Sequence, residues 1–132
     1  MATGKILTAN NAYAKYKEQS VTTATPEELT LMLYNGCIKF INLAEVFIDD
    51  KNIEKINVNI LKAQDIVNEL NITLNMDYEV SENLRQLYSF VNERLIEANL
   101  RKDKKPLLEA KEIVTELRDT WKEAMALSRK GK

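Results

Sequence analysis

Apolar residues recur at steps of three and four along four stretches of this chain, which is the spacing of a buried face on an α-helix. The first stretch, residues 26–48, is the most apolar, and its polar side chains Asn35, Lys39 and Asn42 form only a narrow stripe. A helix with so little polar surface lies at the centre of a bundle or offers a second apolar surface to a partner.

Capping signals and short connections complete the predicted fold. Thr25 before Pro26 and Glu28 is typical of a helix start, because the Thr25 hydroxyl accepts from a free backbone N–H and proline loses no bonded donor. We predict Ser81 as a cap and Pro106 as a first helical residue. The predicted helices are 26–48, 53–74, a third that begins near residues 78–81 and runs to about 102, and 106–128. Connections of a few residues make neighbours antiparallel, which predicts an all-α, up-down-up-down four-helix bundle.

Each of the last three predicted helices has one continuous apolar seam for the core. The seams are Ile53, Ile56, Ile60, Ala63, Val67, Leu70 and Leu74; Leu84, Tyr88, Val91, Leu95 and Ala98, with Leu87 alongside; and Leu107, Ala110, Val114, Leu117, Trp121 and Ala124. Because Trp121 lies on a seam, we expect it in the core and not as a platform for a ligand.

We expect one domain spanning residues 1–132, since this length suffices to bury a core. Its expected parts are an N-terminal arm (1–24), the bundle (25–128) and a basic tail (129–132). A short arm helix would present Tyr13 and Tyr16 but would need docking to persist. Two interpretations stay open: a frayed terminus, or a docked arm with Ile6, Leu7, Tyr13 and Tyr16 that a partner displaces.

Some apolar residues lie opposite the seams, where the bundle does not need them. They are Val58, Leu61 and Ile72 on the second predicted helix, and Ile96 and Leu100 on the third. Antiparallel packing would bring all of these except Ile72 to one end of the bundle. Single exposed apolar residues carry no meaning, but a contiguous patch indicates a groove for an amphipathic helix of another chain. Leu31 and Ile38, beside the polar stripe of the first helix, are a second contact or a support for the arm.

Composition narrows the classes of function. The net charge is −1, which favours neither nucleic acid nor anionic membrane as a partner. Histidine is absent and Cys37 is the single cysteine, so the usual general base, the usual metal ligand and an internal disulfide are all missing. We therefore expect no enzyme, no cofactor and no metal. Lacking a signal peptide or a long apolar run, the chain is expected to be cytoplasmic without membrane insertion.

Ordered segments along the chain carry a family resemblance. They are Ala12-Tyr13, residues 21–29 (VTTATPEEL), residues 32–36 (MLYNG), residues 62–66 (KAQDI) with Leu70, Leu84 with Leu87-Tyr88, residues 94–99 (RLIEAN), and residues 116–118 (ELR) with Trp121. Their order and spacing from about Asn11 to Trp121 resemble the bacterial flagellar secretion chaperone FliS family.

The resemblance implies a cytosolic helical chaperone without ATP or metal. Such a chaperone binds the C-terminal segment of flagellin, prevents its premature polymerisation and hands it to the flagellar export apparatus. The resemblance also implies that the arm lies over part of the binding surface, with Tyr13 at the family's tyrosine position. The family often has an apolar residue three positions earlier, where this chain has Asn10, so we expect Ile6 or Leu7 to replace that anchor. The alternative is a bundle that self-associates as a weak homodimer through the same patch.

Overall fold

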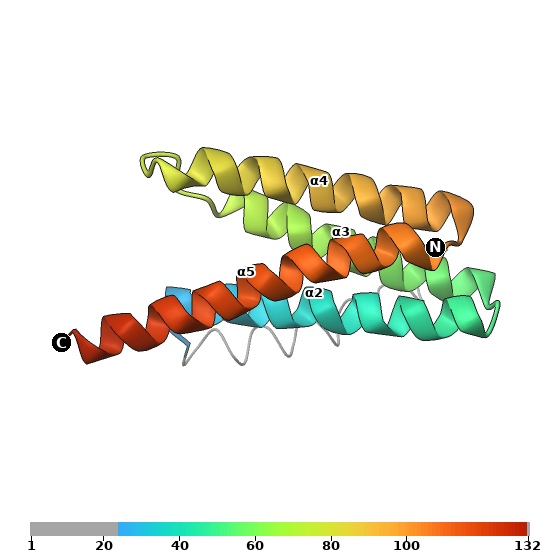
Figure 1. Cartoon of the computed structure of the whole chain (residues 1–132), viewed down its shortest axis with the longest axis horizontal. Coiled ribbons are helices and arrows are strands. Elements are labelled where there is room, and N and C mark those ends of the chain that lie inside the picture. The colour runs from blue at the N-terminus through green and yellow to red at the C-terminus, as the bar shows by residue number, and fades with distance from the viewer. Residues whose placement is uncertain (1–23, 132) are drawn as a thin grey trace, which may run out of the picture. The chain divides into compact units, whose positions relative to one another are not determined.

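The computed structural model describes residues 24–131, and within this range it contains helices and no strand (Figure 1). The helices are α2 (Pro26–Asp49), α3 (Ile53–Ile72), α4 (Val80–Arg101) and α5 (Lys104–Lys130). The prediction of an all-α four-helix bundle is confirmed. The chain has two compact units, Met1–Thr30 and Leu31–Lys132, and the second unit contains most of α2 and all of α3, α4 and α5. The predicted division into arm, bundle and tail stays a prediction.

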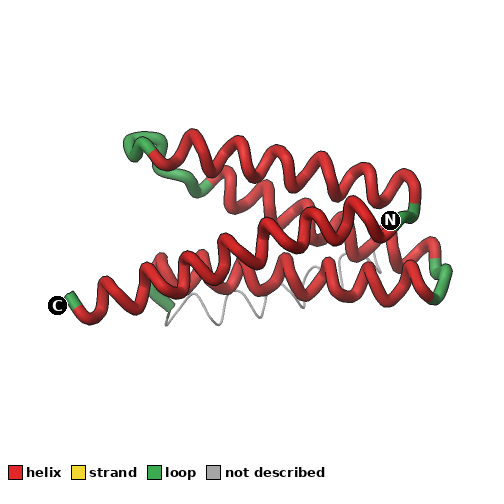
Figure 2. The backbone as a smooth tube through the Cα atoms, in the orientation of Figure 1, coloured by secondary structure: helices red, strands yellow, loops and turns green. Residues whose placement is uncertain are grey.

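Successive helices run in opposite directions, as the tube in Figure 2 shows, and α4 packs directly against both α3 and α5. Polar contacts tie α2 to its neighbours. The Cys37 thiol donates to the Ala63 carbonyl oxygen at 3.8 Å, and the Lys111 ammonium lies 3.5 Å from a Glu45 carboxylate oxygen. These contacts join α2 to α3 and to α5, so the second unit is one four-helix bundle.

Most of the predicted seam residues form the core. Ile60, Ala63, Val91, Leu95, Leu107 and Ala110 are completely buried. The buried hydroxyls of Tyr34 on α2 and Tyr88 on α4 lie 2.6 Å apart and share a hydrogen bond. This bond satisfies polar atoms that would otherwise be costly to bury.

The ends of the seams differ from the prediction. Ile53 is exposed on the first turn of α3, whereas Ile66, absent from the predicted seam, is buried. On α5, Trp121 is only half-buried and Ala124 is exposed. The physical reason is that the two helices diverge: the C-terminal half of α5 separates from the N-terminal half of α4 (Figure 1), so α4 covers the later seam positions of α5 less completely.

Two helix starts agree with capping chemistry. In the first unit, the Glu28 N–H donates to the Thr25 hydroxyl at 3.2 Å, which confirms the predicted cap of α2. The Asn52 side chain accepts from the Lys55 N–H at 3.1 Å at the start of α3. Both caps satisfy backbone donors that have no partner inside the helix.

The predicted Ser81 cap and the predicted Pro106 start are wrong, whereas α4 begins at Val80, inside the predicted range 78–81. Ser81 is the second residue of α4 and not its cap, because its hydroxyl donates to the Asn75 carbonyl oxygen at 2.5 Å. Helix α5 begins before Pro106, with the Asp103 carboxylate accepting from the Lys105 N–H at 3.2 Å. Proline is tolerated there because the first four N–H groups of a helix have no intrahelical acceptor.

Helix α2 is long and apolar enough to cross a membrane, by length and composition alone. Only a third of its most apolar window is buried inside the protein. Cys37, Ile41 and Ala44 are nevertheless completely buried, as expected for a core helix, and such helices pass the same test. Helix α2 therefore combines a core face with surplus apolar surface on its outer side.

Candidate partner-binding surface

The outer face of the α3–α4 pair carries four exposed apolar side chains. Val58 and Leu61 on α3 have exposed fractions of 39% and 46%, and Ile96 and Leu100 on α4 have 46% and 76%. Core residues of the same helices are completely buried, so these four side chains project from the opposite sides of α3 and α4. We name them the α3–α4 patch.

Two hydrogen bonds between asparagines join α3 to α4 beside the patch. The Asn99 amide donates to Asn57 Oδ1 at 2.8 Å, and the Asn92 amide donates to Asn68 Oδ1 at 2.9 Å. These pairs fix the register of the antiparallel helices, which lie side by side in Figure 1. In that register Val58 is level with Leu100, and Leu61 is level with Ile96. The structure therefore brings together the four residues that the sequence placed at one end of the bundle.

The charges around the patch are unevenly paired. On α4, Arg94 contacts Glu93 and Glu109, and the hydrogen bond from its guanidinium lowers the pKa of Glu93. Glu97 pairs with Arg101 one turn along the same helix. Asp65 on α3 is exposed and forms no ion pair with any residue between 24 and 131.

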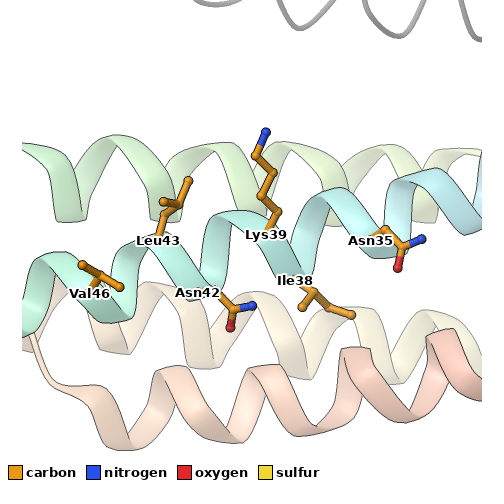
Figure 3. A pocket seen from close by; sticks show the side chains of 6 residues that line it. All are labelled: Asn35, Ile38, Lys39, Asn42, Leu43 and Val46. Atoms are coloured by element: carbon orange, nitrogen blue, oxygen red, sulfur yellow. The ribbon is translucent and has the colours of Figure 1, made fainter.

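A second candidate surface is a shallow hollow of about 430 Å³ on α2 (Figure 3). Within residues 24–131, the residues that line it all come from this helix: Asn35, Ile38, Lys39, Asn42, Leu43 and Val46. The predicted polar stripe is thus interleaved with apolar side chains, as Figure 3 shows. Val46 is half-exposed, whereas Ile38 is 9% exposed and belongs mainly to the core. Leu43 and Val46 are not among the predicted partner residues, because Leu43 falls at the edge of the predicted buried face.

The other predicted partner residues do not join the patch. Leu31 is half-buried, and Ile72 is 82% exposed but lies about 16 Å along α3 from Leu61 at 1.5 Å per residue. The arm residues Ile6, Leu7, Tyr13 and Tyr16 lie outside the described residues. Their proposed roles remain predictions.

Further exposed apolar residues were not predicted from the sequence. Among them are Met76, Tyr78, Val80, Phe90 and Leu127. Most lie in the α3–α4 connection or near a helix end, where periodicity does not tell a core position from a surface one. They show that apolar surface is not confined to the patch.

Catalytic and metal chemistry have little support in the described residues. No group of three His, Cys, Asp or Glu side chains there could hold a metal ion. Burial raises the pKa of the Cys37 thiol to about 12, so the thiolate needed for nucleophilic attack does not form near neutral pH. The chemistry that the two surfaces can offer is the burial of apolar side chains from a partner.

Comparisons with known proteins bear on what that partner is. A family model described as "Flagellar protein FliS" matches residues 9–128. The flagellar secretion chaperone FliS of Bacillus subtilis is 47% identical over 122 residues, covering 92% of each chain. Its Escherichia coli counterpart is 33% identical over 118 residues, covering 86% of this chain and 87% of that one. The Salmonella typhimurium protein of the same name is 29% identical over 116 residues, covering 85% of this chain and 86% of that one.

Proposed function

Since the chain belongs to the FliS family of flagellar secretion chaperones, we propose that it binds the C-terminal segment of flagellin in the bacterial cytosol. Binding would keep flagellin from polymerising before export. The complex would then be delivered to the flagellar export apparatus.

The observation that carries the proposal beyond family membership is the α3–α4 patch. Its apolar side chains are exposed, and two neighbouring helices held in register by asparagine bonds present them level with one another. Such a surface suits one apolar face of an amphipathic helix. Burial of the apolar area would supply most of the free energy of binding, at roughly 25 cal/mol per Å².

The hollow on α2 is the proposed second contact. Ile38, Leu43 and Val46 follow one another along α2 there and offer apolar surface beside the polar side chains that also line the hollow (Figure 3). A flagellin segment that reached both α2 and the α3–α4 pair would be spread over the chaperone and held away from other flagellin molecules. Leu31 lies about one turn before Asn35 on the same helix, and we assign it to this second contact.

The N-terminal arm is proposed to compete with flagellin. Ile6, Leu7, Tyr13 and Tyr16 would cover apolar surface in the unloaded chaperone and would be displaced or rearranged on loading. Docking of the arm must be weak, because its free energy is subtracted from that of flagellin binding.

Co-expression with the flagellin of the same bacterium tests the proposal. We expect wild type to co-purify with flagellin and Leu61→Asp to lose it, since a carboxylate would be buried under the bound helix. Leu108→Asp is the matched control, because Leu108 is a leucine of similar exposure on α5. Retention of flagellin by Leu61→Asp would contradict a role for the patch.

Solution mass at several protein concentrations tests the competing role as a weak homodimer. The chaperone proposal expects Leu61→Asp to change flagellin binding. The patch would serve self-association instead if wild type formed a dimer and bound no flagellin, and if Leu61→Asp were a monomer.

A further inference from the structure

Asp65 continues the line of the patch along α3. Val58, Leu61 and Asp65 are separated by three and four residues, so they share the outward face of this helix. All three are exposed. An amphipathic helix lying on Val58 and Leu61 would therefore pass over Asp65 about one turn later.

This carboxylate differs from the acidic groups near it. Glu93 and Glu97 on α4 are paired with Arg94 and Arg101. Asp65 has neither an ion pair nor a hydrogen bond to any residue in the range 24–131. Within the described residues, its charge is therefore available to a partner without the loss of an existing contact.

The surface beyond Asp65 is polar. The hydrogen bond from the Asn92 amide to Asn68 Oδ1 bridges α3 and α4 there. An apolar side chain placed over Asp65 and this bridge would remove water from a charge and two amides and supply no hydrogen bond. The patch therefore ends at Asp65, and a bound helix with an uninterrupted apolar stripe is disfavoured.

We propose that Asp65 is a specificity-determining residue, which pairs with a lysine or arginine one turn beyond two apolar residues of the bound flagellin helix. The spacing of the partner follows that of α3. Its apolar residues are three or four positions apart and the basic residue follows at i+7, or precedes them in the same spacing if the helix runs the other way. This inference rests on the proposed function, because it specifies which part of the flagellin segment contacts the patch.

The affinity of the flagellin C-terminal segment for chaperone variants tests the inference. An exposed ion pair is worth enough to change affinity by roughly two- to five-fold. We expect a loss of that size in Asp65→Asn, a larger loss in Asp65→Lys, and a flatter salt dependence in Asp65→Asn. Glu112→Lys is the control, since it makes the same charge change at an exposed position on α5. Equal affinities of Asp65→Lys and Glu112→Lys would overturn the inference.

Two synthetic helical peptides give an independent reading. Each peptide has two leucines three positions apart. One charged residue lies four positions before the first leucine and another lies four positions after the second. Both charged residues are lysine in one peptide and glutamate in the other. Because this pattern is symmetric, either orientation places one flanking residue over Asp65. Wild type should prefer the lysine peptide and Asp65→Lys the glutamate peptide, whereas an unchanged preference in Asp65→Lys would overturn the inference.

The outcomes separate the two proposals. If wild type binds flagellin with no dependence on residue 65, the inference fails and the proposed function stands. If wild type binds no flagellin, the proposed function fails and the inference fails with it. Thermal unfolding of each variant shows whether a lost affinity reflects a lost fold.

Discussion

Leu95 and Leu100 are the same residue type on the same helix, and the structure assigns them opposite consequences when each is changed to alanine. Leu95 is completely buried, whereas Leu100 is 76% exposed at the edge of the α3–α4 patch. Truncating a buried leucine removes transfer free energy and leaves a cavity, at a cost of about 2–5 kcal/mol. We therefore expect Leu95→Ala to lower the free energy of unfolding by that amount.

Leu100→Ala should leave stability within about 0.5 kcal/mol, as for most surface substitutions. We expect Leu100→Ala to weaken the binding of the flagellin segment instead. Full burial of a leucine side chain is worth about 1.5–3 kcal/mol, and about three-quarters of Leu100 remains to be buried by a partner. The expected loss is about 1–2 kcal/mol, which corresponds to a roughly five- to thirty-fold weaker affinity for the flagellin segment.

Urea unfolding followed by circular dichroism measures the first effect, and calorimetric titration with the flagellin C-terminal segment measures the second. Leu108→Ala on α5 is the control, because it removes an exposed leucine away from the patch. Unchanged affinity in Leu100→Ala would remove this residue from the binding surface. A stability loss in Leu100→Ala as large as in Leu95→Ala would refute the division into core and surface.

Other changes test the core, the ionisable groups, the driving force and the arm. Leu70→Asp puts a carboxylate at a buried position and should cost several kcal/mol in thermal or urea unfolding, so unchanged stability would mean that the seam is misplaced. Burial raises the pKa of both Tyr34 and Tyr88 above 10.0, so stability should fall as pH rises above about 10, and the double Phe variant should fall less; identical pH profiles would contradict this. Flagellin binding should have a negative heat-capacity change and a weak salt dependence, whereas a steep loss at moderate salt would indicate mainly ionic recognition. Tyr13→Ala should weaken flagellin binding, and unchanged affinity with free hydrogen exchange of residues 1–20 in both states would reduce the arm to a disordered terminus.

Much of this fold is predictable because helix periodicity and capping are local. The three–four spacing on α3 identifies Ile60 and Ala63 as core positions, and a bundle built from such seams needs no information beyond short connections. The Thr25 cap is also local, since its donor lies three residues away. These features depend on neighbours in sequence, which is why the sequence suffices for them.

The errors occur where burial depends on a partner helix. Periodicity continues through Trp121 and Ala124, but the C-terminal half of α5 separates from α4 (Figure 1) and leaves these positions partly open. Ser81 has the composition of a cap, yet its hydroxyl bonds to a carbonyl in the preceding loop. No local rule could have shown either outcome.

The candidate site is predictable in part for the same reason. Surplus apolar residues opposite the seams point to Leu61 and Ile96, and antiparallel packing is enough to bring them level. The asparagine bonds beside them depend on side-chain geometry between α3 and α4, and the hollow that Val46 lines depends on side-chain geometry along α2. The sequence specifies neither. The isolation of Asp65 likewise emerges only once every neighbouring ion pair is placed.

We propose that this chain binds flagellin through the C-terminal segment of flagellin. The most direct test compares calorimetric titrations of the chaperone with full-length flagellin and with flagellin lacking that segment. We predict saturable one-to-one binding of the full-length protein and no detectable binding of the truncated one. Equal affinity for both proteins would contradict binding through the C-terminal segment.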